Sequence, residues 1–299
     1  MPNLREIRRR IKSIKNTAQI TKAMQMVAAS KMRKAQQQAL AATPYQDLLD
    51  SIAASLHAAR SATDYTHPLM LQRPVNHHTI LLITTDKGLC GALNANLIRE
   101  TLKYETENPA TRFFYITIGR KGRQFLTRLG RNLIADFELK ENFGFRDTKK
   151  ISQYLIDSFI ENKTDKVTVA YSQFINTLTQ RPTLAQILPL GEHSAGFSTA
   201  ATVKQITSTR DTTDQYLFEP PPETLLNSML PYFLHYSVYQ KILSARASEH
   251  SARMVAMKNA TDNAKTLVKD LTLEYNKQRQ AAITTELLEI STAQMVMNQ

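Results

Sequence analysis

The stretch LREIRRRIKSIKNTA at residues 4–18 decides the fold of the first arm of the chain. Its apolar residues follow alternating steps of three and four, the spacing of a coiled-coil seam: Leu4, Ile7, Ile11, Ile14 and Ala18. The same spacing returns near the other end of the chain, at Val268, Leu271 and Tyr275 and then at Ile283, Leu287 and Ile290. Because a single helix cannot bury such a stripe alone, we expect the two arms to pair as an antiparallel coiled coil.

Glycine and proline are placed in a way that supports two long arms. All eight glycines of the 299-residue chain lie from Gly88 to Gly196, and no proline follows Pro231. Since these residues are the main helix breakers, helical arms are predicted over residues 1–60 and 221–299. We expect an interruption or bend near Pro44, a helix start in the proline run at 219–222, and a kink at Pro231.

The segment between the arms, residues 75–210, alternates apolar strands with helices. Strands are predicted at HTILLITTD (78–86), RFFYITIG (112–119), NLIADFEL (132–139), KVTVAYSQF (166–174) and 183–190, and helices at 93–106, 120–130 and 149–162. This alternation is typical of a doubly wound, mainly parallel sheet. The predicted fold class is therefore α/β plus a long antiparallel coiled coil, with the two terminal helices packed together around an inserted Rossmann-like domain.

Positive charge is concentrated at the start of the chain. The net charge is +12, from 38 Lys and Arg against 26 Asp and Glu, and residues 1–40 contain a single acidic side chain, Glu6. Such a helix usually binds nucleic acid, anionic lipid or an acidic protein, although a solvated face is the alternative. A basic, amphipathic start is also found in targeting presequences. Because the periodicity continues without a cleavage-site break, we interpret it as the start of the mature helix.

Nothing in the sequence indicates catalysis. TTDKGLCGALN (84–94) lies where a phosphate-binding loop would lie, but it lacks both GxGxxG and Walker spacing, so Gly88 and Gly91 are interpreted as a structural turn. Cys90 has no histidine partner at a motif spacing, and His77 and His78 lack the neighbours of a metal site. We predict no catalytic residue, cofactor or metal. The longest apolar run is strand-sized, too short to span a membrane.

Both arms also carry specific motifs. NTAQITKAMQMVAASKMRKAQ (16–36) and SARMVAMKNATDNA (251–264) closely resemble the signature segments of the gamma subunit of F-type ATP synthase, of the bacterial type. LEYNKQRQAAITTELLEI (273–290) is similar to the terminal helix of that family, and QFINTLTQRPTLAQILPL (173–190) to a strand and turn in its middle. The resemblance covers nearly the whole chain. It implies a coiled-coil shaft and a Rossmann-like foot domain without a nucleotide.

The resemblance implies a rotor subunit that is not itself an enzyme. Such a subunit couples rotation of the membrane c-ring to ATP synthesis or hydrolysis at the beta subunits of an alpha–beta hexamer. The implied partners are the alpha and beta subunits, the epsilon subunit and the c-ring, and no nucleic acid. The implied location is the cytoplasmic face of the bacterial inner membrane, to which the subunit would be peripheral.

The resemblance also assigns roles to individual residues. Contacts to the hexamer would be made by Met24, Arg253, Arg279, Gln280, Thr284 and Glu286. A basic collar of Arg8, Arg9, Arg10, Arg33 and Lys34 would face an acidic loop of the beta subunits. The chain departs from many relatives at Ala92 and Ala264, where they have glycine, and in its last residues, 291–299. Two other functions remain open: a basic coiled-coil protein that binds nucleic acid, and an enzyme that uses the GLCG turn.

Overall fold

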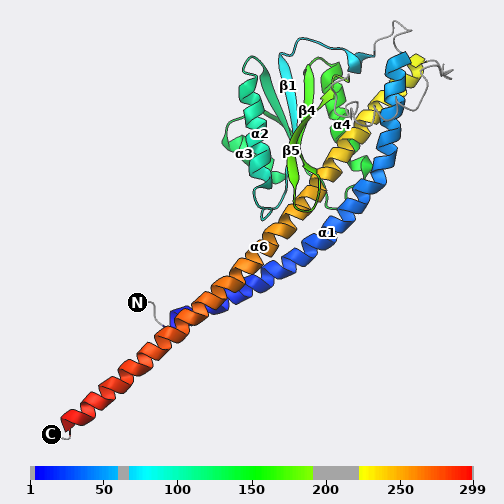
Figure 1. Ribbon diagram of the computed structural model, residues 1–299. Coiled ribbons are helices and arrows are strands. Elements are labelled where there is room, and N and C mark those ends of the chain that lie inside the picture. The colour runs from blue at the N-terminus through cyan, green and yellow to red at the C-terminus, as the bar shows by residue number, and fades with distance from the viewer. Residues whose placement is uncertain (1–3, 60–66, 191–221, 298–299) are drawn as a thin grey trace. The chain divides into compact units, whose positions relative to one another are not determined.

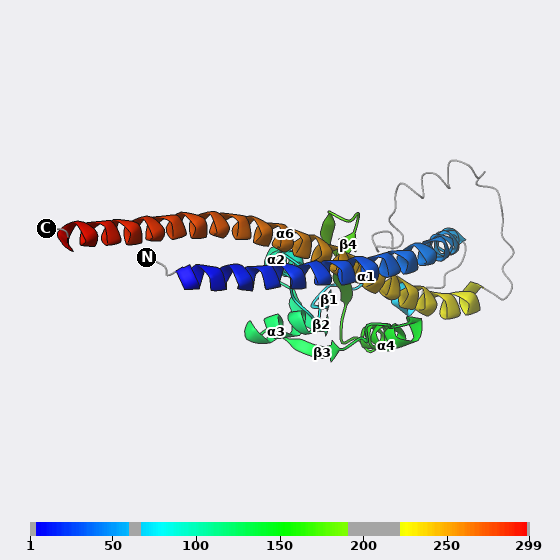
Figure 2. The same cartoon turned by 90° about the horizontal axis from the view of Figure 1, so that it is seen from below.

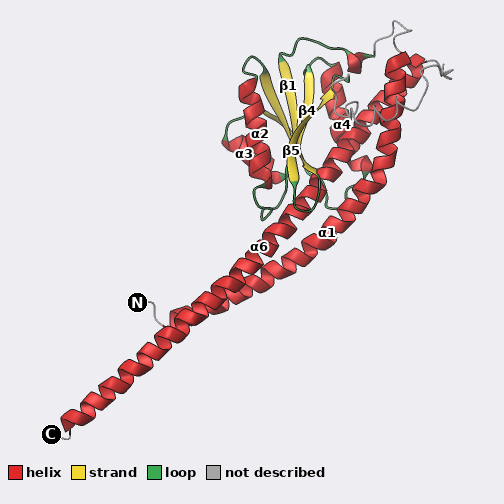
Figure 3. Ribbon diagram, in the orientation of Figure 1, coloured by secondary structure: helices red, strands yellow, loops and turns green. Residues whose placement is uncertain are grey.

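The computed structural model describes residues 4–59, 67–190 and 222–297 (Figure 1; Figure 3 colours its helices and strands). Residue 60, the end of the predicted middle segment at 191–210, most of the proline run at 219–222 and the last two residues lie outside this description. The elements are, in order, α1 (Leu4–Ala59), η2 (Pro68–Met70), β1 (His77–Ile83), α2 (Leu93–Glu107), β2 (Arg112–Ile118), α3 (Arg120–Arg128), β3 (Leu133–Phe137), α4 (Phe145–Ile160), β4 (Lys166–Phe174), β5 (Gln180–Leu188) and α6 (Pro222–Met297).

The chain divides into two compact units. The first, here called the coiled-coil unit, contains residues 1–30 and 253–299. The second, the α/β unit, contains residues 31–252. Both α1 and α6 contribute to each unit.

In the coiled-coil unit the beginning of α1 and the end of α6 run antiparallel, side by side (Figures 1 and 2). Ile7 is 2% exposed, and the other predicted seam residues of α1 are half-buried while the residues between them are exposed. Val268, Leu271 and Tyr275 are half-buried in the same way on α6. A hydrogen bond of 2.7 Å joins the hydroxyls of Thr21 and Thr261 across the pair. The predicted antiparallel pairing is confirmed over this length.

The last part of the predicted seam is not buried. Ile283, Leu287 and Ile290 are 48%, 62% and 59% exposed. The prediction that they pack against the other arm is wrong, because α6 continues beyond the point where α1 begins at Leu4 (Figures 1 and 2). The end of α6 therefore presents an apolar stripe with no described helix of this chain beside it.

Two prolines expected to disturb the arms leave the helices unbroken. Of the interruption or bend predicted near Pro44, the interruption is absent, since α1 is continuous from Leu4 to Ala59. α6 likewise continues through Pro231. The bend and the kink stay predictions. A proline removes one backbone hydrogen bond and crowds one carbonyl, while the bonds on either side persist. In a long helix the neighbouring turns can therefore carry the chain past a single proline.

The α/β unit contains a five-stranded sheet in the order β3-β2-β1-β4-β5. β1 is parallel to both β2 and β4, β2 is parallel to β3, and β5 is antiparallel to β4. All five predicted strands are present, so the mainly parallel sheet is confirmed. α4 begins at Phe145, four residues before the predicted start, because the carboxylate of Asp147 accepts a hydrogen bond from the Gly144 N–H at 2.8 Å and caps this helix.

Helices cover both faces of the sheet. Side chains alternate along a strand, so Leu81 and Ile83 of β1 enter one core and Ile80 and Leu82 the other. The first core is completed by α4 and by the part of α6 from Leu226 to Ala245, and the second by α2 and α3. Burial on both faces explains why the central strands read as nearly continuous apolar runs. The α/β unit is thus a doubly wound, Rossmann-like domain.

Candidate functional site

The carboxyl edge of the sheet is where doubly wound domains bind their ligands, at the point where the strand order reverses. Here that point lies between β1 and β4, and a segment of α6 fills it. The guanidinium of Arg246 lies 3.6 Å from the carboxylate of Asp86, which follows β1, and 3.2 Å from that of Glu249. The cavity left beside Thr85, Asn94 and Arg246 is about 10 Å³, room for one water molecule.

The turn after β1 is a structural turn held by side chains. Asn94 donates a hydrogen bond to the Thr85 hydroxyl at 2.7 Å, and Thr85 donates to the Lys87 carbonyl at 2.8 Å. Gly91 has a φ of +61°, a backbone conformation that favours glycine. Leu89 adopts the same conformation, with a φ of 62°. Gly88 does not have a positive φ, and a Cβ there would meet nothing within 4 Å. Of the two glycines in this turn, only Gly91 therefore has a backbone conformation that favours glycine.

These observations disfavour the enzyme that would use the GLCG turn. Cys90, within the turn, is only 3% exposed. The carboxyl edge of the sheet beside the turn is occupied by α6. Among the described residues no group of three or more His, Cys, Asp or Glu side chains could hold a metal ion. In the same part of the chain no helix is apolar over enough residues to cross a bilayer.

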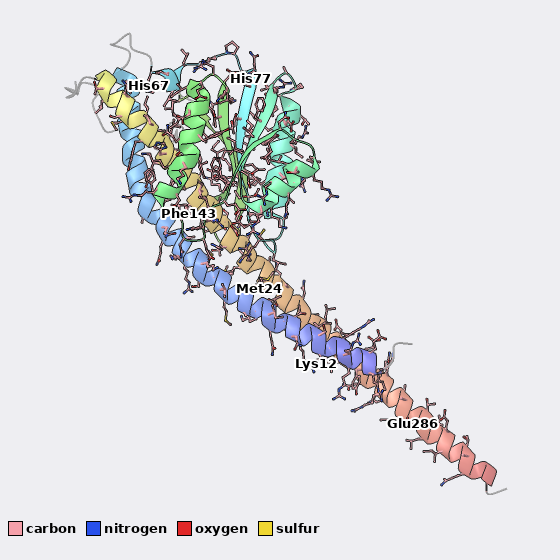
Figure 4. The ribbon with its side chains drawn as sticks, turned by 180° about the vertical axis from the view of Figure 1, so that it is seen from behind. Lys12, Met24, His67, His77, Phe143 and Glu286 are labelled. Carbon is pink, nitrogen blue, oxygen red and sulfur yellow. The ribbon has the colours of Figure 1, made fainter. Side chains whose placement is uncertain are left out.

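The predicted hexamer contacts all lie on the coiled-coil unit. Met24 on α1 and Arg253 on α6 are half-buried. The remaining four are exposed along α6, and Figure 4 shows Glu286 on the part of that helix that extends past α1: Arg279, Gln280, Thr284 and Glu286. The Thr284 hydroxyl donates to the Gln280 carbonyl at 2.9 Å, so it is engaged within its own helix.

The structure does not gather the predicted basic collar in one unit. Arg8, Arg9 and Arg10 are exposed on α1 in the coiled-coil unit, where Arg10 pairs with Glu6 at 2.8 Å. Arg33 and Lys34 are exposed in the α/β unit, where Lys34 donates to the Asn142 side chain at 3.2 Å.

Large exposed apolar side chains are a second feature of the coiled-coil unit. Met26 is 60% exposed, and the others are 48% to 62% exposed: Ile20, Val27, Leu267, Leu273, Ile283, Leu287, Leu288 and Ile290. Ile283, Leu287 and Ile290 follow steps of four and three and so share one face of α6, and an exposed apolar face marks a protein-binding region. The exposure of Ile20 and Leu288 was not predicted from the sequence. The signal that could have found them is an apolar residue placed off the coiled-coil seam.

The fold defines a class of protein in which the two terminal helices pair with each other and, in the sequence, flank a Rossmann-like domain. Residues 3–295 match the sequence family described as ATP synthase. The chain is 49% identical over 305 residues to the ATP synthase gamma chain of Methylacidiphilum infernorum, covering 99% of this chain and all of the relative. It is 47% identical to that of Opitutus terrae, covering 98% of each chain.

Solved structures agree with this assignment. The central stalk and c-ring structure of the Tetrahymena thermophila mitochondrial ATP synthase contains a chain that is 26% identical, with a TM-score of 0.62, covering 81% of this chain and 99% of that one. A chain in the Euglena gracilis mitochondrial ATP synthase has the same fold, with a TM-score of 0.66 at 20% identity, covering 98% and 94%. The chain belongs to the ATP synthase gamma chain family.

Proposed function

We propose that this chain is the central rotor shaft of an F-type proton-translocating ATP synthase. It couples rotation of the membrane c-ring to ATP synthesis or hydrolysis at the beta subunits of the alpha–beta hexamer, and it has no catalytic role of its own. The observation that carries the proposal is full-length similarity to gamma chains, together with an exposed apolar stripe at the end of α6. That stripe has the character of a surface that partner subunits cover.

The three chain segments have distinct roles in this proposal. Residues 1–60 and 221–299 form the shaft, and residues 75–210 form the foot, which contacts the epsilon subunit and the c-ring. Within the shaft, Met24, Arg253, Arg279, Gln280, Thr284 and Glu286 contact the hexamer. A rotor must release each position as it turns, and the flexible, polarizable side chain of methionine allows contacts that repack readily.

Exposed charges suit the same requirement. Arg8, Arg9 and Arg10 on the coiled-coil unit, and Arg33 and Lys34 on the α/β unit, each face acidic groups of the beta subunits. An exposed ion pair contributes only about 0.2–1 kcal/mol, so it can form and break at each step. The electrostatic attraction between exposed charges is screened over a Debye length of about 8 Å at physiological salt. It can therefore hold a moving partner without fixing one orientation.

We place the subunit in the peripheral F1 sector of the membrane-bound complex, on the cytoplasmic face of a bacterial inner membrane. The curated relatives come from bacteria, including Methylacidiphilum infernorum and Opitutus terrae, which supports this location.

Co-purification tests the proposal directly. The tagged chain should purify from its native membranes at one copy per hexamer, with alpha, beta and epsilon subunits. Leu287→Asp should reduce recovery of the hexamer, because it places a charge on a side chain that is 62% exposed in the free chain and is covered in the complex. Leu178→Asp is the matched control, since Leu178 is 79% exposed in the α/β unit.

The basic N-terminal arm keeps nucleic-acid binding as the competing outcome. Affinity for DNA in the absence of other subunits, falling steeply with salt, would favour it. Recovery of the chain with nucleic acid and without the hexamer would overturn the rotor proposal.

A further inference from the structure

Three serines line one face of α6 where this helix crosses the carboxyl edge of the sheet. Ser244, Ser248 and Ser251 are separated by four and three residues, so they lie above one another on a single helix face. Ser248 and Ser251 are completely buried. Serine in a helix interior ordinarily bonds its own backbone or faces solvent. These serines instead bond the neighbouring sheet.

All three hydroxyls engage main-chain groups of β4 or of the turn that follows it. The Ser244 hydroxyl accepts from the Phe174 N–H at 3.0 Å, and Ser248 donates to the Ser172 carbonyl at 2.8 Å. Ser251 donates to the Thr177 carbonyl at 2.6 Å. The strand and its turn are thus bonded to α6 over two helical turns.

Arg246 holds two other loops to the same stretch of α6. Besides its ion pairs with Asp86 and Glu249, its guanidinium donates to the Leu139 carbonyl at 3.4 Å. The guanidinium carbon also lies 5.8 Å from the centre of the Phe143 ring. Asp86 follows β1 and Leu139 follows β3, so α6 is bonded to loops after three strands of the sheet.

The contacts of α6 change character along the helix. From Leu226 to Ala245 it packs into the apolar core, an interaction that has no preferred direction. From Ser244 to Ser251 it also makes hydrogen bonds to the sheet, which weaken steeply when their geometry is turned. The α/β unit ends at residue 252, so these bonds lie where α6 leaves that unit.

We propose that the three serines and Arg246 form a clamp that prevents α6 from turning about its own axis against the α/β domain. They are positioning residues that pass torque between this domain and the helix, and they do so by fixing its angle. The inference rests on the proposed rotor function. It adds the place at which the rotating force enters α6, and it explains why polar side chains occupy the edge that a ligand would otherwise use.

The torsional stiffness of the assembled rotor tests the clamp. The hexamer is immobilised, a bead is attached to the α/β domain, and angular fluctuations are recorded while the motor is paused. The double variant Ser248→Ala/Ser251→Ala should increase the variance of the bead angle at least about twofold, because two directional bonds are lost. Unloaded ATP hydrolysis and subunit stoichiometry should stay at the wild-type level.

The matched control is Ser158→Ala/Ser228→Ala, since these hydroxyls donate to carbonyls of their own helices, those of Tyr154 and Leu225. Its variance should equal that of the wild type. An unchanged variance in a fully assembled Ser248→Ala/Ser251→Ala complex would overturn the clamp.

A crosslink keeps the test decisive if the serine variant fails to assemble. Cysteines at Thr177 and Ser251 would join the turn to α6 where the clamp already holds them. Rotation should continue at the same rate after oxidation, whereas arrest that is reversed by reduction would overturn the clamp. Failure of the wild-type chain to join a hexamer would instead contradict the proposed function, so the two failures are distinguishable.

Discussion

Gly119, between β2 and α3, has a backbone conformation that other residues rarely adopt. Its φ is +96°, and a Cβ built there would lie 2.3 Å from the Thr84 carbonyl oxygen. We expect Gly119→Ala to lower the free energy of unfolding by about 3 kcal/mol, from backbone strain and this clash. Gly88→Ala is the matched control and should change it by less than about 0.5 kcal/mol. Urea unfolding of the chain measures both, and equal losses would contradict the assignment.

His78 links stability to pH. Burial lowers its pKa to about 3 from the ordinary 6.5, helped by the charge of Lys166, and its ring lies 2.8 Å from the Thr168 hydroxyl. Between pH 6.5 and 3 the unfolded chain therefore binds a proton at His78 that the folded chain does not. This contribution to stability is fully present above pH 6.5 and is lost as the pH falls.

The slope from this histidine is about 1.4 kcal/mol per pH unit at most. His78→Gln keeps a polar partner for Thr168 and removes the titration. We expect the free energy of unfolding of this variant to decline less steeply than that of the wild type between about pH 6 and about pH 4.5, in urea titrations. Parallel declines would show that the ring does not remain neutral in the folded chain.

At the scale of the elements, the end of α6 invites a comparison of two variants. Residues 291–294 are exposed, and so are Arg279 and Gln280. The difference is that only Arg279 and Gln280 are assigned to hexamer contacts. Deleting residues 291–299 should change coupled proton pumping little. Arg279→Ala/Gln280→Ala should reduce it about fivefold, the effect of losing roughly 1 kcal/mol of contact. The reverse order, measured in inverted membrane vesicles, would assign the main contact to the tail.

The elements were largely predictable from the sequence because their patterns are local. The apolar run from Ile80 to Ile83 predicts a strand buried on both faces, and the three–four spacing from Leu4 to Ala18 predicts the paired helix. What could not be predicted depends on distant residues. The exposure of Ile283 and Leu287 follows from where α1 begins, and the start of α4 follows from a cap made by Asp147.

The candidate site was harder to predict than the fold. Ser248 and Ser251 have no motif, and their importance appears only when the fold brings β4 against α6. The hexamer contacts stay a prediction that rests on resemblance, since nothing in the spacing of Arg279 or Glu286 indicates a partner. A contact between two subunits depends on the sequences of both, so the sequence of one chain does not reveal it.

For the whole molecule, coupling is the property to measure. Met24 is half-buried on α1 within the basic arm, and Met24→Lys adds a charge there. We expect ATP hydrolysis by the assembled complex to persist while ATP-driven proton pumping falls about fivefold, because an altered charge contact of roughly 1 kcal/mol changes rotor steps more than folding. Met26→Lys, at a residue that is 60% exposed, is the control. An unchanged ratio of pumping to hydrolysis would remove Met24 from the contact.

The filled edge of the Rossmann-like sheet has a consequence for regulation. In the proposed function, the rotor turns among sites that bind and release ATP. The concentrations of ATP and ADP around it therefore vary with the energy state of the cell. Because Arg246 and Glu249 occupy the described edge, leaving about 10 Å³, an adenine nucleotide does not fit there. We expect the stiffness of this subunit to be independent of the ATP-to-ADP ratio, so a response of the enzyme to that ratio must arise elsewhere in the complex.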